Sequence, residues 1–154
     1  MKLISVNTGG PRDIEADGQV VRTSIWKSPR AGRLQAMRLN IEGDQQSDLA
    51  VHGGPYKAVY CYPSEHYAYW RAELPGVELP LGMFGENLTM EGLLETDVFI
   101  GDRISIGTAQ RMACTACITR TSVGCFIAIP PWIPKWCPTL CAILCGWPWI
   151  AIRP

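Results

Sequence analysis

The stretch DLAVHGGPYKAVYCYPSEHYAYW, residues 48–70, contains the signals for a turn, a strand and a helix in direct succession. Its HGGP segment, residues 52–55, combines two glycines with a proline and favours a tight turn. The next segment, KAVYCY at residues 57–62, has the β-branched and aromatic composition of a strand. PSEHYAYWRAEL, residues 63–74, opens with Pro-Ser and is followed by another proline, which predicts one short helix.

The predicted helix places three large apolar side chains at helical spacing, namely Tyr67, Trp70 and Leu74. This spacing is typical of a helix face that packs into a core, so we assign these residues a structural role. Elsewhere, turn signals rich in Gly and Pro recur at short intervals, and the runs between them have strand composition. These runs cover residues 19–26, 33–41, 57–62 and 97–107. The sequence therefore predicts a mainly β fold, a barrel or a sandwich with one helix.

The overall composition fits one domain with its own core, because the chain has 154 residues. Its formal net charge is zero, which gives no overall attraction for nucleic acid or for an anionic membrane. Any anion site is therefore expected to be local. The apolar stretch after Lys2 is shorter than the core of a secretory signal, so we expect a cytoplasmic protein.

The composition changes abruptly near Gln110. Residues 1–109 carry all 14 acidic residues and a single cysteine, whereas residues 110–154 have no acid, six cysteines and four of the six tryptophans. A folded domain usually distributes its charges over its whole surface. We therefore treat residues 1–109 as one domain and residues 110–154 as an atypical tail. Whether the tail belongs to the fold stays open.

The turn at residues 52–55 carries the first candidate binding residues. His52 begins it and Lys57 follows it, so basic side chains stand beside backbone amides in a segment that glycines leave open to a ligand. That combination suits a phosphate or another oxyanion. The same turn is also common as a plain connection between strands.

A second glycine bend lies in GMFGENLTMEGLLE, residues 82–95. Glu86 and Asn87 follow it directly and supply a carboxylate and an amide for binding, although Asn87 is also suited to a left-handed turn. Lys27 ends a strand-like run in RTSIWKSP, residues 22–29. It is a candidate for the same pocket, or else an ordinary solvated lysine.

These segments occur together in one order, and with them the chain resembles the MOSC family, named for the C-terminal domain of molybdenum cofactor sulfurases. It is most similar to the small bacterial stand-alone members that are linked to resistance against N-hydroxylated purines. The resemblance runs from about Ile4 to Ala109. It rests on RTSIWKSP, DLAVHGGPYKAVYCYPSEHYAYW, GMFGENLTMEGLLE and VFIGDRISIGTA.

The resemblance implies a β-barrel with one or more short helices that binds the molybdenum cofactor, a molybdopterin, in a cleft. It also implies reductive detoxification of N-hydroxylated bases or related compounds, with a flavoprotein reductase as electron donor. A non-catalytic carrier of cofactor or sulfur is the alternative. Cations beside glycine-turn amides suit the phosphate and pterin of this cofactor. The residues that fall on family motif positions, and would line the cleft, are Lys27, His52, Lys57, Glu86 and Asn87.

Family members usually continue with Gln-Pro-Arg-x-Pro-Cys, and that cysteine is the expected thiolate ligand of molybdenum. Here QRMAC, residues 110–114, keeps Gln, Arg and Cys but neither proline. Cys114 is therefore our first candidate for the metal ligand and the catalytic group. Cys117 and Cys125 are alternatives at a distance from Ala109 nearer to the expected one.

Other interpretations of the tail also stay open. A shifted reading frame would change the composition at one point, and the chain would then be an inactive truncated relative. Alternatively, the C-x-x-C pair and the cysteines that follow would hold zinc or an iron–sulfur cluster; these are Cys114, Cys117, Cys137, Cys141 and Cys145. The apolar run at residues 136–152 contains two prolines and a glycine, which argues against a membrane anchor.

Overall fold

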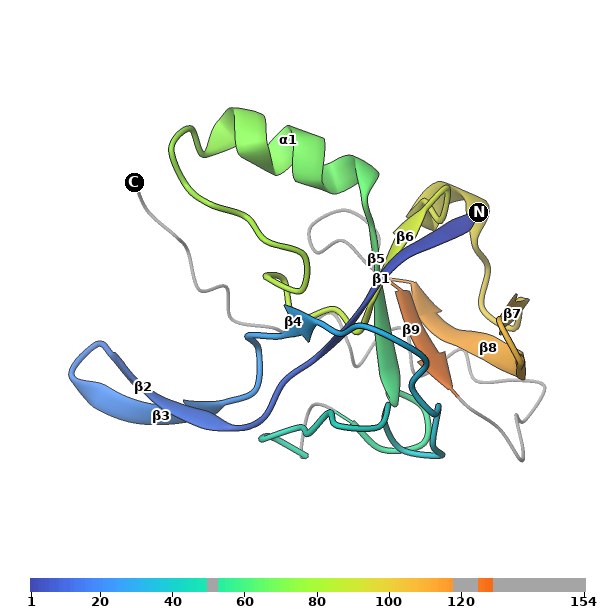
Figure 1. Ribbon diagram of the computed structural model, residues 1–154, viewed down its shortest axis with the longest axis horizontal. Helices are drawn as coiled ribbons and strands as arrows, with labels where there is room; N and C mark the ends of the chain where they lie inside the picture. Colours follow the sequence, from blue (N-terminus) through green and yellow to red (C-terminus); the bar gives the residue numbers. More distant parts are fainter. Residues whose placement is uncertain (50–52, 118–124, 129–154) are drawn as a thin grey trace.

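Most of the regular secondary structure in the described part of the chain consists of short strands (Figure 1). The computed structural model describes residues 1–49, 53–117 and 125–128. It contains one α-helix, α1 (Glu65–Glu73), and one 3-10 helix, η1 (Glu95–Asp97). The strands are β1 (Lys2–Thr8), β2 (Arg12–Ala16), β3 (Gln19–Thr23), β4 (Ser28–Pro29), β5 (Val59–Pro63), β6 (Leu88–Glu91), β7 (Arg103–Ile106), β8 (Ala109–Cys117) and β9 (Cys125–Ala128).

One seven-stranded sheet organises these elements, with the order β4-β1-β6-β5-β9-β8-β7. Strands β5 and β6 run parallel, and the other neighbouring pairs are antiparallel. Strands β2 and β3 form a separate hairpin that projects away from the sheet in Figure 1. The prediction of a mainly β fold with one short helix is confirmed. The predicted closure into a barrel is not found within the described residues, where β4 and β7 remain the two edges of the sheet.

Three of the four predicted strand regions contain a strand, since residues 19–26 hold β3, residues 57–62 hold most of β5, and residues 97–107 hold β7. The prediction for residues 33–41 was wrong. This segment has only an isolated bridge between Ala36 and Ile41, because the Met37 N–H donates to the Asn40 carbonyl at 2.9 Å and closes a turn.

The region that begins at Gln110 contributes to two strands of the sheet. Strand β8 crosses Gln110, where the composition changes, and β9 pairs with both β5 and β8. Among the described residues no helix is long and apolar enough to cross a membrane, and no three metal-binding side chains gather at one point. The cysteines proposed for a tail cluster at positions 137, 141 and 145 lie outside the described residues.

Helix α1 lies where the sequence predicts it, and Tyr67 is its buried residue. Trp70 is partly buried and packs against the cluster of Tyr62, Tyr67 and Leu79. The Ser64 hydroxyl does not cap the helix, because it donates to the Glu65 side chain at 3.4 Å. Instead, the Glu65 carboxylate accepts the Gly92 N–H at 2.7 Å, which ties the start of the helix to the end of β6.

Strand β5 separates two apolar clusters because its side chains alternate between the faces of the sheet. Val59 and Cys61 are buried with Leu88 and Met90 of β6 on one face. Tyr60 and Tyr62 face the other side, where Tyr62 is buried with Tyr67, Leu79 and their partly buried neighbours Trp70 and Phe84. Tyr62 stacks on Phe84 with ring centroids 4.7 Å apart. Both faces of β5 are therefore covered.

Gly82 brings two distant segments into direct backbone contact. Its φ is +90°, and a Cβ at this position would lie 2.6 Å from the Lys27 carbonyl oxygen. The Lys27 N–H in turn donates to the Gly82 carbonyl at 3.3 Å. Only glycine permits both the left-handed conformation and the close approach.

We predict that Gly82→Ala destabilises the fold by about 3 kcal/mol, because backbone strain and a backbone collision add together. Gly76→Ala is the matched control, since Gly76 also has a positive φ of 85° but open space around its Cα. The control is expected to cost only about 1 kcal/mol. Urea unfolding of both variants measures the difference, and equal losses would show that the contact with Lys27 is absent.

The aromatic cluster buries phenol groups, and burial raises the pKa of Tyr60, Tyr62 and Tyr67. For Tyr67 the hydrogen bond to the Glu86 carboxylate raises the pKa further. The unfolded chain releases these protons near the ordinary value of 10, whereas the folded chain keeps them. Their contribution to stability is therefore complete below pH 10 and is lost as the pH rises above it.

We predict that the free energy of unfolding falls above about pH 10, by up to about 1.4 kcal/mol per pH unit for each such tyrosine. Tyr67→Phe should reduce this slope, whatever it does to stability at neutral pH. Tyr69→Phe, on the same helix but 57% exposed, should leave the slope unchanged. Urea titrations at several pH values test this, and the same slope in Tyr67→Phe and the wild type would contradict it.

Candidate functional site

Asp44 is the centre of a buried polar network. It is 2% exposed, and its Oδ1 accepts hydrogen bonds from the Lys27 Nζ at 2.5 Å and the Gly9 N–H at 3.0 Å. Its Oδ2 accepts from the Asn87 Nδ2 at 2.8 Å. Because Lys27 is only 9% exposed, both charges of the ion pair are withdrawn from water. Together with Asn87, the pair therefore joins the loop before β4, the turn after Ile41 and the start of β6.

Asn87 and Asn7 brace this network against the sheet. The Asn87 Oδ1 accepts the Tyr60 N–H at 3.1 Å, so the amide that holds Asp44 also holds strand β5. The Asn7 Nδ2 donates to the Thr89 hydroxyl at 3.0 Å and to the Glu86 carbonyl at 3.3 Å. Both amides are engaged within the protein, and their side chains lock β1, β5 and β6 in register.

Glu86 lies beside the network and is completely buried. Its Oε1 accepts from the Tyr67 hydroxyl, the Gly82 N–H and the Thr89 hydroxyl, at 2.5, 2.8 and 2.8 Å. Its Oε2 has no hydrogen-bond partner within the described residues. Glu86 thus fixes the glycine bend that presents Asn87, a structural role that the sequence did not predict for this carboxylate.

The HGGP turn is present, since Gly53 and Gly54 have φ values of 86° and 76°. The Lys57 N–H closes it by donating to the Gly54 carbonyl at 3.2 Å. Lys57 is partly exposed, and burial lowers the pKa of its ammonium group. His52 lies outside the described residues. Of the predicted site residues, the structure brings Lys27, Glu86 and Asn87 into one layer and places Lys57 at the end of the HGGP turn.

The cysteine candidates lie on the two strands that follow β7. Cys114 pairs with Ile127 across β8 and β9, and Cys117 pairs with Cys125. Their side chains lie outside the described part of the structure. Cys61, by contrast, is buried in the apolar cluster on β5.

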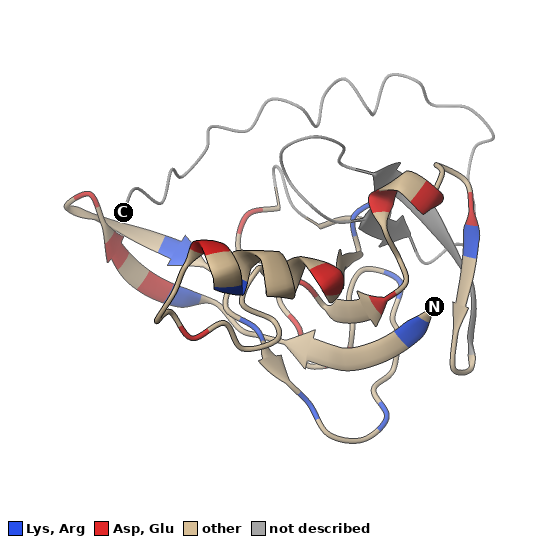
Figure 2. Ribbon diagram, turned by 90° about the horizontal axis from the view of Figure 1, so that it is seen from above, with Lys and Arg blue, Asp and Glu red and all other residues tan. Residues whose placement is uncertain are grey.

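The Lys27 ammonium retains hydrogen-bonding capacity beyond its contact with Asp44. An ammonium group carries three N–H bonds, and only the one to Asp44 has an acceptor within the described residues. A cation whose side chain is 6% exposed therefore keeps donor capacity while its position is fixed. Figure 2 shows acidic and basic residues interspersed over the chain, so such local donors are the features that favour an anion.

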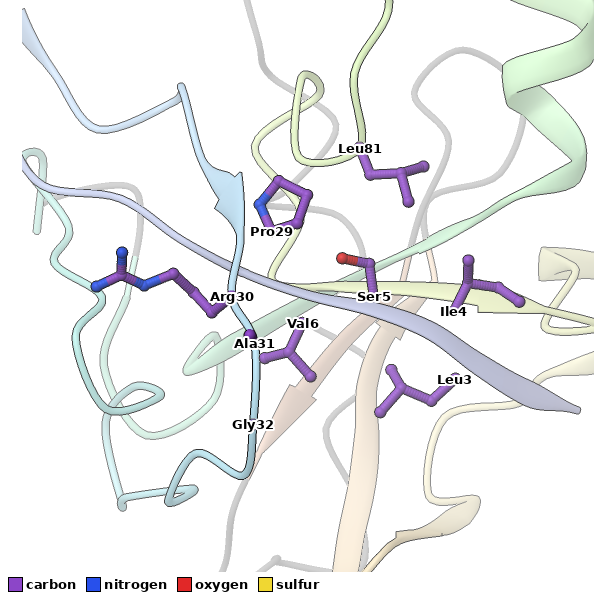
Figure 3. Close-up of a pocket in the computed structure, with 9 residues that line it drawn as sticks. All are labelled: Leu3, Ile4, Ser5, Val6, Pro29, Arg30, Ala31, Gly32 and Leu81. Atoms are coloured by element: carbon purple, nitrogen blue, oxygen red, sulfur yellow. The ribbon is translucent and has the colours of Figure 1, made fainter.

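A shallow groove of about 610 Å³ is lined by residues 3–6 of β1, residues 29–32 and Leu81 (Figure 3). Leu3, Val6 and Leu81 give it an apolar surface. The Arg30 side chain points away from Leu81 and Ser5 in Figure 3. The Ser5 hydroxyl donates inward to Asn7 Oδ1 at 2.7 Å. The groove thus offers apolar contact, and Ser5 connects it to the polar network.

Sequence reasoning missed two members of the network, Asp44 and Asn7. Asp44 stands in EGDQQSD, residues 42–48, which reads only as a turn. The only signal for Asp44 in the sequence was indirect. A lysine in a buried site needs a carboxylate partner, and the acidic residues near glycine turns were candidates for that partner. Asn7 stands in a strand that the sequence did not predict.

Comparison with known proteins identifies the family to which the chain belongs. A family model for the MOSC domain matches residues 48–125, half of the chain. The chain is 47% identical over 100 residues to an uncharacterized protein, YflK, of Bacillus subtilis strain 168. The matched region covers 65% of this chain and 45% of that protein. It is 41% identical over 108 residues to the protein YiiM of Escherichia coli strain K12, over 69% and 47% of the two lengths.

A solved structure agrees with these matches. The crystal structure of YiiM from Geobacillus stearothermophilus superimposes with a TM-score of 0.54 at 26% identity, over 81% of this chain and 65% of that one. The chain spans about half the length of the curated relatives it matches. From the family model and these relatives, we conclude that the chain belongs to the MOSC domain family.

Proposed function

We propose that this protein binds the molybdenum cofactor and serves the reductive detoxification of N-hydroxylated bases or related N-oxygenated compounds. Membership of the MOSC family supports the proposal. The observation that carries it is the Lys27 ammonium, which Asp44 fixes in a nearly buried position with two N–H donors unused by the described residues. Such a donor matches an anionic, hydrogen-bonding group such as a cofactor phosphate.

The residues present fit the polar part of this cofactor. Lys27 and Lys57 would hold the phosphate as cations, together with the amides of the glycine turn that the Lys57 N–H closes. His52, which lies outside the described residues, is a candidate from the sequence alone. Asn87 and Glu86 have their side chains bonded to the protein, so they would shape the site from beneath. In this arrangement the protein binds and orients the cofactor and limits the access of water to it.

When bound, the cofactor would supply a metal centre that accepts electrons and removes oxygen from the substrate. A flavoprotein reductase is the electron donor that we propose. Cys114 is the proposed thiolate ligand, because a soft sulfur donor suits molybdenum.

The alternative is a non-catalytic carrier of cofactor or sulfur, or an inactive truncated relative. One observation favours it: QRMAC lacks both family prolines. The coding DNA around Gln110 separates a truncation from a genuine tail. A continuation of the family pattern in another frame identifies the truncation, and its absence from both other frames identifies a genuine tail.

We predict that Lys57→Ala lowers cofactor retention about tenfold, because a charge-assisted hydrogen bond to phosphate is lost. Molybdenum and pterin content per purified chain measures retention. Lys2→Ala, which removes an exposed lysine, is the control and should retain the wild-type amount. Unchanged retention in Lys57→Ala would remove Lys57 from the site.

We predict that Cys114→Ser abolishes reduction of an N-hydroxylated base, because serine replaces the thiolate that the metal prefers. Cys117→Ser and Cys125→Ser are the matched variants on β8 and β9. Turnover with an artificial reductant measures the effect. If all three variants keep full activity and cofactor, the cysteine-ligated oxidoreductase is wrong; loss in Cys117→Ser or Cys125→Ser alone would reassign the ligand.

A further inference from the structure

Asp44 has an unusual set of partners for a residue in a loop. It is the only described carboxylate that bonds at once to a lysine ammonium, a backbone N–H and a side-chain amide. Two of these partners, Lys27 and Asn87, are candidate site residues. The third, the Gly9 N–H, comes from the end of β1, where a Cβ on Gly9 would lie 2.3 Å from the Trp26 carbonyl oxygen.

The burial of the pair makes the arrangement rigid. The side chains of Lys27 and Asp44 are 6% and 0% exposed, so water cannot replace either partner. A buried ion pair is seldom the most stabilising choice, because apolar side chains of the same size often serve equally well. What the pair does provide is one defined direction for the unused N–H donors of Lys27.

We propose that Asp44 is the positioning residue of the candidate cofactor site. It aims the Lys27 ammonium at the anionic part of the cofactor and, through Asn87, couples that cation to strands β5 and β6. The inference rests on the proposed function for the identity of the ligand. The geometry that it assigns to Lys27 stands independently of that ligand.

Asp44→Asn tests the inference, since it removes the charge and keeps the size. Without a counter-ion, a buried ammonium is disfavoured against the neutral amine, which is the form that reacts with acylating reagents. We expect acetic anhydride to acylate Lys27 about tenfold faster than in the wild type, relative to exposed Lys2 in the same chain, as read by mass spectrometry. Molybdenum and pterin content should fall about tenfold.

Asp13→Asn is the matched control, because Asp13 pairs with Arg22 at 3.1 Å on the exposed β2–β3 hairpin. It should change neither measurement. A folded Asp44→Asn chain that protects Lys27 and retains cofactor as the wild type does would overturn the proposal. If wild-type protein binds no cofactor while Lys27 acylation still depends on Asp44, the proposed function fails and the assigned geometry of Lys27 is supported.

A double variant covers the case in which Asp44→Asn does not fold. Lys27→Met with Asp44→Leu buries no charge and should fold, as circular dichroism will show. It should lose cofactor to the same extent as Lys27→Met alone, because Asp44 acts through Lys27. Full cofactor retention in the double variant would exclude a role for the pair.

Discussion

The ion pair between Lys27 and Asp44 is the constraint on which the geometry of the protein depends. Two opposite charges withdrawn from water must stay together, because either one alone would remain uncompensated in the interior. Their meeting requires the loop before β4, the turn after Ile41 and the start of β6 to converge. The close backbone approach between Lys27 and Gly82 belongs to the same convergence. Electrostatics thus determines where three loops meet.

A second layer of polar contacts, made by residues in and beside the sheet, supports the place where these loops meet. Glu86 collects three donors on one oxygen and holds the glycine bend, while Asn7 and Asn87 connect β1, β5 and β6. Hydrogen bonds are directional, so a framework of this kind specifies positions more narrowly than apolar packing does. The Tyr67 hydroxyl, which donates to Glu86, connects this framework to the aromatic cluster. A site built above such a framework changes little in shape when a ligand enters.

Local signals in the sequence predicted the elements that depend on local chemistry. The helix over residues 63–74, the glycine turns and strand β5 all follow from spacing and composition. Segment 33–41 was mistaken for a strand because its apolar residues resemble one, whereas a hydrogen bond from Met37 to Asn40 makes a turn. Asp44 could not be found in this way. Its partners lie 17, 35 and 43 residues away in the sequence. Local composition does not predict which residues so far apart come into contact.

The position of β9 in the strand order has a consequence for the integrity of the sheet. Although β9 comes from the region of changed composition, it lies between β5 and β8. A chain cut at Ala109 would therefore lose an interior strand. The central β5 would become an open edge, and its unpaired N–H and carbonyl groups would be available for pairing with other molecules. The acid-free region thus contributes the backbone that covers the edge of β5.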